Sequence, residues 1–322
     1  MLWALSLIGL GLIGLWLGSD LMVSCSAKVA WRARFPALLT GLTIVSIGTS
    51  VPEISVSVTG ALDIISGLET SGVVIGDNIG SFICQLLLIL GIVGFSNTIV
   101  VPERSVKRDG PMLLISLAVF YIVCIDQVIS RVDGYLLVAV YLGYNVYVFL
   151  KERKGETDIG EKTRTGMCWR EQHPLLDLVY LIIGLSLVIL ASAFVVDQAI
   201  NLATFLNIDQ FLIGIVLVGV GTSMPELVVS LQSARKGESD ISIGNVVGSN
   251  VTDLLFATAV GAIVAQNLHV GPSILFFDLP FAFIASSIFL LLARRRLKVD
   301  RSVSLILLMV FGSYVALKIM GM

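Results

Sequence analysis

The feature that most constrains this chain is a series of ten apolar stretches, each long enough to cross a membrane. The hydrocarbon core of a bilayer is about 30 Å thick, so a spanning helix needs about 20 mostly apolar residues. The stretches lie near residues 2–23, 36–62, 71–97, 110–127, 132–150, 175–196, 209–234, 240–266, 272–293 and 302–321. Only 14% of the 322 residues are charged, against about 25% in soluble domains. The sequence therefore predicts an all-α integral membrane protein with ten transmembrane helices.

The distribution of positive charge predicts how these helices are oriented. Of the 21 Lys and Arg residues, 19 lie in alternate loops, and only Arg131 lies in a loop on the other side. Cytoplasmic loops of membrane proteins concentrate Lys and Arg. Because no basic residue precedes Lys28, the first stretch is interpreted as a retained helix rather than a signal peptide. We expect a multi-pass protein of the cell (plasma) membrane with both termini outside.

The chain contains an internal repeat. The segment GTSVPE at 48–53 recurs as GTSMPE at 221–226, and GDNIGS at 76–81 recurs as GNVVGS at 244–249. Each half holds five stretches, so the second half must enter the membrane from the opposite side, an arrangement typical of secondary transporters. The expected organisation is a first five-helix repeat at 1–150 (motifs within 41–90), a cytoplasmic linker at 151–173 and a second repeat at 174–322 (motifs within 214–258).

The GTSxPE segments place oxygen atoms around a helix break. Pro52 and Pro225 lack an N–H group and clash with the preceding turn, so each should free backbone carbonyls inside an apolar helix. Unpaired carbonyls are costly in lipid, and a bound cation would satisfy them. Hydroxyls precede each break at Thr49, Ser50, Thr222 and Ser223, and carboxylates follow it at Glu53 and Glu226.

The next helix of each half carries a polar stripe. Asp77, Ser81 and Gln85 are spaced four residues apart, as are Asn245, Ser249 and Asp253. Residues four apart share one face of a helix. Asp77 has no acidic counterpart in the second half, so it could join the site, pair with a backbone group or face a vestibule.

These side chains form an all-oxygen ligand set, which suits hard cations such as Ca²⁺ with its 6–8 oxygen ligands. His173 and His269 lie outside the motifs and no thiol pair is present, which disfavours zinc and copper. Two carboxylates balance one divalent ion, and the same pocket could instead hold a few monovalent ions. The candidate metal ligands are Thr49, Ser50, Glu53, Ser81, Gln85, Thr222, Ser223, Glu226, Ser249 and Asp253, with Asp77 and Asn245 as further possibilities. No catalytic residue and no organic cofactor is expected.

GTSVPE, GTSMPE and the GNVVGSN stretch before Asp253 resemble the two alpha-repeats of the sodium/calcium exchanger family, prokaryotic type, within the cation/calcium exchanger superfamily. The resemblance implies an antiporter, not an enzyme, that uses inward sodium flow to expel calcium by alternating access. Its partners would be calcium and sodium ions and the lipid bilayer, without nucleic acid or an obligate protein partner. The ion ligands it implies are Thr49, Ser50, Glu53 and Ser81 from the first repeat and Thr222, Ser223, Glu226, Ser249 and Asp253 from the second. The first repeat departs from the family pattern at Asp77, at Phe82 and at Gln85.

Other functions remain open from the sequence. A proton- or potassium-coupled calcium/cation antiporter would use the same architecture, but proton-coupled relatives typically carry an acid where this chain has Gly80 and Gly248. A cation channel would need a repeated selectivity loop, which the sequence lacks. An intramembrane aspartyl protease would need two facing aspartates, for which Asp77 and Asp253 are the candidates, but it would leave the Pro-Glu and Gly-Ser segments unexplained.

Overall fold

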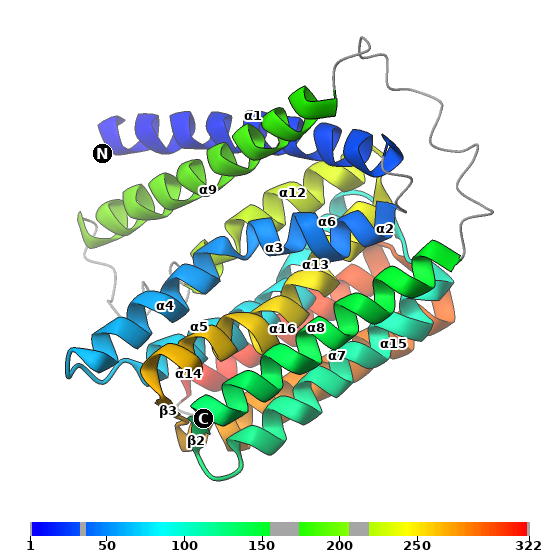
Figure 1. Ribbon diagram of the computed structural model, residues 1–322. Coiled ribbons are helices and arrows are strands. Elements are labelled where there is room, and N and C mark those ends of the chain that lie inside the picture. The colour runs from blue at the N-terminus through cyan, green and yellow to red at the C-terminus, as the bar shows by residue number, and fades with distance from the viewer. Residues whose placement is uncertain (1, 33–36, 155–173, 206–218, 321–322) are drawn as a thin grey trace.

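The computed structural model describes residues 2–32, 37–154, 174–205 and 219–320, and these residues are almost entirely helical (Figure 1). The helical elements of the first half are α1 (Leu2–Arg32), α2 (Ala37–Thr40), the π-helical turn η1 (Gly41–Val45), α3 (Ser46–Thr49), α4 (Val51–Ile65), α5 (Ser71–Ile83), the π-helical turn η2 (Cys84–Ile89), α6 (Leu90–Ser96), α7 (Glu103–Cys124) and α8 (Arg131–Lys154). Those of the second half are α9 (Pro174–Phe205), α11 (Gly219–Thr222), α12 (Met224–Arg235), α13 (Ser239–Val251), η6 (Thr252–Ala257), α14 (Thr258–Ala265), η7 (Ile274–Asp278), α15 (Leu279–Arg296) and α16 (Arg301–Ile319).

Every predicted apolar stretch contains helix where it is described. Within the described residues, seven helices are long and apolar enough to span a membrane, or eight if Leu38–Thr49 and Val51–Ile65 form one bent span. α7 is not among the seven, since it begins with five charged residues in its first seven. α12 has only 12 residues, and the part of its predicted stretch before residue 219 lies outside the described residues. The count of ten spans therefore stays a prediction, as do the repeat boundaries; α8 continues to Lys154, four residues into the predicted linker.

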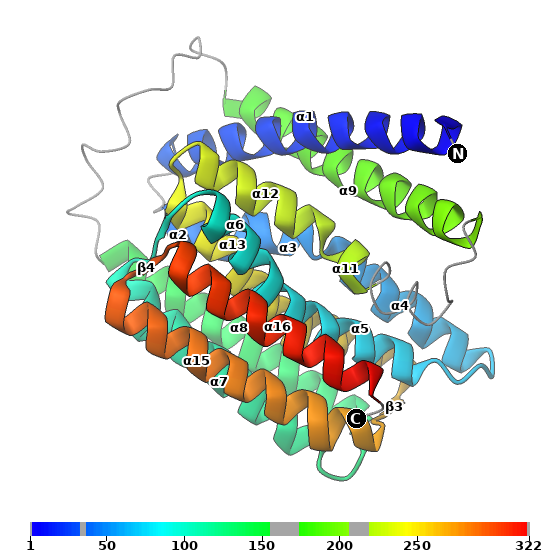
Figure 2. The same ribbon diagram turned by 180° about the vertical axis from the view of Figure 1, so that it is seen from behind.

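The first helix of each half is longer than the sequence predicts. α1 has 31 residues and α9 has 32, and they end at Arg32 and Phe205 rather than near 23 and 196. At 1.5 Å per residue each is about 47 Å long, so each must tilt to fit a hydrocarbon core of about 30 Å. The two helices lie side by side along one side of the bundle (Figures 1 and 2). Their backbones approach closely at Gly184, where an added Cβ would lie 2.7 Å from the Met22 nitrogen.

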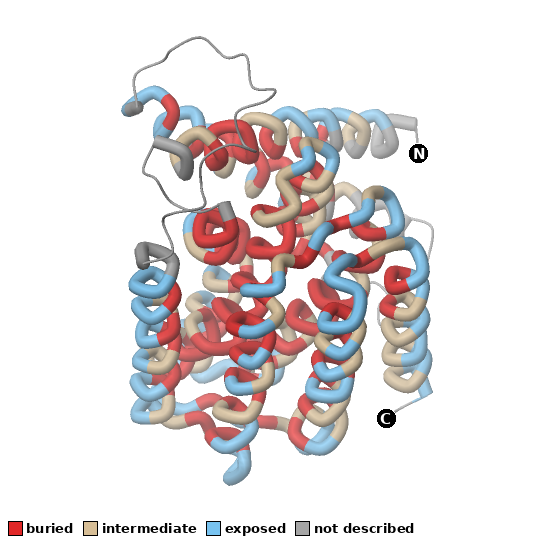
Figure 3. The backbone as a smooth tube through the Cα atoms, turned by 90° about the vertical axis from the view of Figure 1, so that its right-hand side faces the viewer, coloured by how far each residue is buried: buried red, intermediate tan, exposed pale blue. Residues whose placement is uncertain are grey.

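The continuous path α13–η6–α14 runs through the centre of the bundle. Every residue of α13 from Ile241 to Val251 is buried, and Figure 3 shows that buried residues concentrate in the interior. α13 packs directly on η1, because a Cβ on Gly244 would lie 2.8 Å from the Leu38 carbonyl oxygen, and one on Gly41 would lie 2.8 Å from the Ile241 carbonyl oxygen. Small residues let membrane helices pack backbone to backbone in this way. The two motif regions of the chain are thereby held against each other.

Four short strands, which the all-α prediction did not include, connect the loops. β1 (Ile99–Val100) pairs antiparallel with β4 (Lys298–Val299), and β2 (Val128–Ser130) pairs antiparallel with β3 (Asn267–His269). Runs of two or three residues show no periodicity, so they could not be predicted from the sequence. Each pair joins one loop of the first half to one loop of the second, and both loops of a pair were predicted on the same side of the membrane.

Candidate cation site

The two GTSxPE segments break their helices in the same way. α3 ends at Thr49 and α4 begins at Val51, and the axis bends by 43° between them. The residue at the break, Ser50, has φ −78° and ψ 8°, and its counterpart Ser223 has φ −83° and ψ 7°. In both segments proline stands in the first turn of the new helix, where its missing N–H has no helical partner to lose. The predicted break is present in both halves.

Each break places a glutamate at the start of a helix. Glu53 lies in the first turn of α4 and Glu226 in the first turn of α12, and both residues are fully buried. The positive end of the helix dipole favours a negative charge at this position. The Oε2 atom of each carboxylate is buried without a hydrogen-bond partner among the described residues. A buried carboxylate oxygen without a partner is costly, so both positions call for a cation or a proton.

The two glutamates and six side chains near them form two rows that mirror each other. In the first oxygen row, the Thr222 hydroxyl lies 3.2 Å from Asp77 Oδ1 and 3.3 Å from Ser81 Oγ, and Ser81 Oγ lies 3.5 Å from Glu53 Oε1. In the second oxygen row, the Thr49 hydroxyl lies 3.0 Å from Asn245 Oδ1 and 3.4 Å from Ser249 Oγ, and Ser249 Oγ lies 3.3 Å from Glu226 Oε1. Each row takes its threonine from the opposite half of the chain.

The contacts that end on the glutamates are long. Ser81 to Glu53 is 3.5 Å, Ser249 to Glu226 is 3.3 Å and Ser50 to Glu226 is 3.4 Å. A tight hydrogen bond from a hydroxyl to an oxygen measures about 2.7–2.8 Å. The oxygens are therefore close to one another without being committed to short hydrogen bonds, which leaves their lone pairs available to a metal ion.

Gln85 and Asp253 meet across the centre. Gln85 lies in η2 and Asp253 in η6, and Gln85 Nε2 donates to Asp253 Oδ2 at 2.8 Å. Both residues are fully buried, and Gln85 Oε1 and Asp253 Oδ1 have no partner in the described part of the chain. π-helical turns are rare and occur frequently at functional sites. Here they turn an amide and a carboxylate of opposite halves toward each other.

Each predicted ligand except Ser223 contacts another of them, whereas Ser223 is buried and makes no such contact in the described part of the chain. The structure also adds residues that were missed. Ser57 and Ser230 are buried and bind Asn78 Nδ2 at 3.0 Å and Asn245 Nδ2 at 2.9 Å, respectively. Each serine follows its motif glutamate by four residues. Comparing the two repeats beyond the GTSxPE letters would have found them, because the same residue recurs at the same distance.

The donor set is mixed rather than a cluster of acids. In the ranges that the structure describes, no three side chains of the His, Cys, Asp and Glu types gather as a metal site of their own. Asp253 and the carboxylates of the two oxygen rows instead contact a hydroxyl or an amide. His269 lies in β3, away from this layer, and His173 falls outside the described residues. That the site uses oxygen ligands alone, without histidine or thiol, stays a prediction.

Similarity to known proteins identifies the family. The pattern described as sodium/calcium exchanger protein matches residues 3–150 and 176–320. The chain belongs to the sodium/calcium exchanger family. It is 30% identical over 319 residues to the putative antiporter CaxA of Alkalimonas amylolytica, covering 98% of each chain. It is 27% identical over 339 residues to the sodium/calcium exchanger MaX1 of Methanosarcina acetivorans, covering 95% of each.

A solved exchanger shares the fold. The structure of the sodium-calcium exchanger NCX_Mj soaked with 2.5 mM Na⁺ and 0.1 mM Ca²⁺ superposes with a TM-score of 0.80 at 28% identity, covering 98% of both chains. The family and this fold are those of transporters. The chain is therefore a membrane antiporter of the exchanger type and not an enzyme, so the aspartyl protease alternative is not supported.

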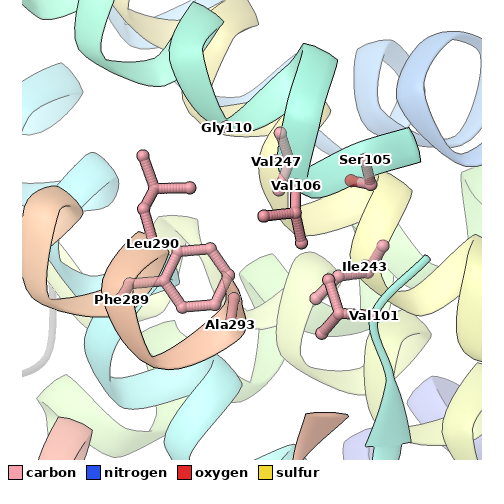
Figure 4. Close-up of a pocket in the computed structure, with 9 residues that line it drawn as sticks. All are labelled: Val101, Ser105, Val106, Gly110, Ile243, Val247, Phe289, Leu290 and Ala293. Carbon is pink, nitrogen blue, oxygen red and sulfur yellow. The ribbon is translucent and has the colours of Figure 1, made fainter. Parts of the chain in front are cut away.

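A separate cavity lies between α7, α13 and α15 (Figure 4). Its volume is about 10 Å³, which is room for about one water molecule. Its lining is apolar apart from Ser105 and includes Val101, Val106, Gly110, Ile243, Val247, Phe289, Leu290 and Ala293. None of the candidate ligands lines it, so this cavity is not part of the cation site.

Polar contacts at one end attach the α1–α9 pair to the other helices. Lys236, directly after α12, lies 2.8 Å from Asp20 Oδ1 of α1, and Gln232 Nε2 of α12 donates to the same oxygen at 2.8 Å. Lys28 of α1 lies 3.8 Å from Asp177 of α9. These contacts lie away from the oxygen rows, so they position helices without supplying ligands.

Proposed function

We propose that this chain exchanges Na⁺ for Ca²⁺ by alternating access at the layer that holds Glu53 and Glu226. The observation that carries the proposal is the pair of equivalent helix breaks, each of which ends in a buried glutamate with an unpartnered oxygen. Ions bound between two matched halves can be reached from either side when the halves exchange conformations.

The proposed ligand set accounts for competition between the two ions. Ca²⁺ takes 6–8 oxygens, and two glutamates balance its charge. When Ca²⁺ leaves, the same carboxylates require replacement cations, because empty buried charges are costly. Na⁺ meets that need at neighbouring oxygens, so the two cargoes exclude each other. The ligands are Thr49, Ser50, Glu53, Ser81, Gln85, Thr222, Ser223, Glu226, Ser249 and Asp253.

The same proposal includes the surroundings of the site. The protein lies in the plasma membrane with both termini outside, the five-helix repeats cover 1–150 and 174–322, and residues 151–173 link them on the cytoplasmic face. The bias of Lys and Arg toward alternate loops supports this orientation. Transport requires neither an organic cofactor nor a protein partner.

The test is ⁴⁵Ca²⁺ uptake into Na⁺-loaded proteoliposomes that are diluted into Na⁺-free, K⁺-free buffer at equal pH. We expect uptake that needs the Na⁺ gradient and that falls at least about a hundredfold in Glu53→Gln and in Glu226→Gln, since each removes a charge that Ca²⁺ requires. Glu69→Gln is the matched control, because Glu69 is exposed in the loop before α5.

Two results would contradict the proposal. Uptake driven only by a pH gradient or by internal K⁺ would keep the site but replace the coupling ion. Full uptake in both glutamine variants would remove Glu53 and Glu226 from the site.

A further inference from the structure

The two oxygen rows differ at the residue where each begins. The second row begins at Asn245, which is fully buried. Its Oδ1 atom accepts from Thr49, and its Nδ2 atom donates to Ser230 Oγ at 2.9 Å and lies 3.4 Å from the Glu226 carbonyl oxygen. Asn245 therefore ties α13 to α12, and both ends of its amide are occupied.

In the first half, another residue makes the corresponding tie. Asn78 Nδ2 donates to Ser57 Oγ at 3.0 Å and to the Val74 carbonyl oxygen at 2.9 Å. Ser57 is the counterpart of Ser230, so Asn78 connects α5 to α4 as Asn245 connects α13 to α12. Asp77, which stands opposite Asn245 in the repeat, has no part in this helix contact.

Asp77 instead begins the first oxygen row with a carboxylate that is only partly occupied. Its Oδ1 atom accepts from Thr222 at 3.2 Å, while its Oδ2 atom has no partner in the described part of the chain. The residue is partly exposed, whereas Asn245 is not. The unpartnered Oδ2 atom is itself buried. A carboxylate at membrane depth with a buried, unused oxygen is suited to bind a cation.

From Asp77 the row continues to the buried site without a gap in its oxygens. Thr222 Oγ1 lies 3.3 Å from Ser81 Oγ, which lies 3.5 Å from Glu53 Oε1. Each step is short enough for one cation to contact two successive oxygens at the 2.3–2.6 Å typical of Ca²⁺. The row therefore connects the carboxylate of a partly exposed residue with that of the fully buried Glu53.

We propose that Asp77 is an outer cation ligand that binds Ca²⁺ arriving from the side of the membrane on which α5 begins, and passes it along Thr222 and Ser81 to Glu53. This inference rests on the proposed function. Since the attraction between ion and carboxylate doubles with the charge of the ion, Asp77 favours a divalent cation over a monovalent one. The opposite row begins with a neutral, fully bonded amide, so the two sides of the protein differ in apparent calcium affinity. With the termini outside, α5 begins on the extracellular side.

The test compares right-side-out and inside-out membrane vesicles from cells that express the full chain. Asp77→Asn introduces the residue found at the matching position 245 and keeps the acceptor for Thr222. We expect it to raise the half-saturating Ca²⁺ concentration of Na⁺-dependent ⁴⁵Ca²⁺ uptake about fivefold on the side where α5 begins. We expect no change on the opposite side and a maximal rate within about twofold of wild type. Asp77→Glu should restore most of the affinity. Asp63→Asn is the control, because Asp63 is an exposed acid near the end of α4.

The outcomes separate this inference from the function on which it rests. An effect confined to one vesicle type supports the outer ligand. An equal effect in both types, or an unchanged half-saturating concentration in Asp77→Asn, overturns it while wild-type exchange stands. Should wild type show no Na⁺-dependent uptake, the proposed function fails, and equilibrium ⁴⁵Ca²⁺ binding to purified protein decides about Asp77. Weaker binding in Asp77→Asn but not in Asp63→Asn supports the ligand, and equal binding in all three proteins overturns it.

Discussion

The central layer and the α1–α9 pair are both built from close helix contacts, but among the described residues of these two regions only the central layer carries buried carboxylates that no lysine faces, namely Glu53, Glu226 and Asp253. In the centre, Gly41 and Gly244 bring two backbones together, and the residues beside them supply the oxygen rows. In the pair, Gly184 brings α9 equally close to α1. Its buried Asp177 faces Lys28 at 3.8 Å, and buried Ser192 of α9 donates to the Gly221 carbonyl oxygen at 3.4 Å. Tight packing in the centre therefore positions ligands, whereas in the pair it joins two helices.

The largest difference between the two regions should appear when a methyl group is added at Gly244 in the centre and at Gly184 in the pair. Gly244→Ala places a Cβ 2.8 Å from the Leu38 carbonyl oxygen, and Gly184→Ala places one 2.7 Å from the Met22 nitrogen. Overpacking of this kind costs about 1–3 kcal/mol, so both variants should unfold at a lower temperature in detergent. Only Gly244→Ala should also weaken Ca²⁺ transport, since it displaces Asn245 next to it.

The control for this pair is Gly143→Ala on the exposed face of α8, where an added Cβ meets nothing within 4 Å among the described residues. Alanine favours helix over glycine by about 1 kcal/mol, so this variant should unfold at the same temperature or a higher one. A rise in the half-saturating Ca²⁺ concentration in Gly184→Ala as large as that in Gly244→Ala would abolish the distinction between the two regions.

Much of this architecture was predictable because membrane-spanning helices need long apolar runs, and such runs can be read directly. The helix breaks were predictable because proline removes a backbone N–H from the helix in which it lies, whatever packs around that helix. The end of α1 was not, since Ser24 satisfies its hydroxyl within the helix by donating to the Asp20 carbonyl oxygen. Polar residues that end an apolar run therefore need not end the helix.

The candidate ligands could be chosen from the sequence, but their pairing could not. Spacing within one helix says which residues share a face and not which face of another helix they meet. The contact of Thr49 with Asn245, and that of Thr222 with Asp77, joins opposite halves of the chain. The approach of Gln85 to Asp253 also depends on η2 and η6, whose π-helical turns depart from the four-residue spacing that the prediction assumed.

An intermediate effect should come from the contact between Gln85 and Asp253. Both of these residues are fully buried, unlike Lys236 and Asp20 at the α1–α9 pair. Gln85→Leu removes the amide that donates to Asp253 Oδ2 and leaves a buried carboxylate oxygen without its donor. The cost of such an orphaned group is about 1–3 kcal/mol, so the half-saturating Ca²⁺ concentration should rise about tenfold, measured by ⁴⁵Ca²⁺ uptake.

Gln85→Asn separates loss of the amide from loss of its reach. It keeps both amide atoms one methylene further from Asp253, so its effect should lie between those of wild type and Gln85→Leu. Equal affinity in wild type and Gln85→Leu would show that the contact contributes nothing to the site.

The smallest effect should come from the contact that attaches the α1–α9 pair to α12. Asp20→Asn removes the charge that faces Lys236 at 2.8 Å, but the new amide still accepts from Gln232. The side chains of Lys236 and Asp20 are 22% and 39% exposed, and ion pairs open to solvent contribute about 0–1 kcal/mol. A double-mutant cycle with Lys236→Met should therefore give an interaction energy within that range, measured from unfolding temperatures, and it should shrink as salt is added. An interaction energy as large as the loss of stability in Gly244→Ala, or one that salt does not change, would mean that the pair is fixed to the bundle as firmly as the central layer is. The two regions would then differ in their ligands alone.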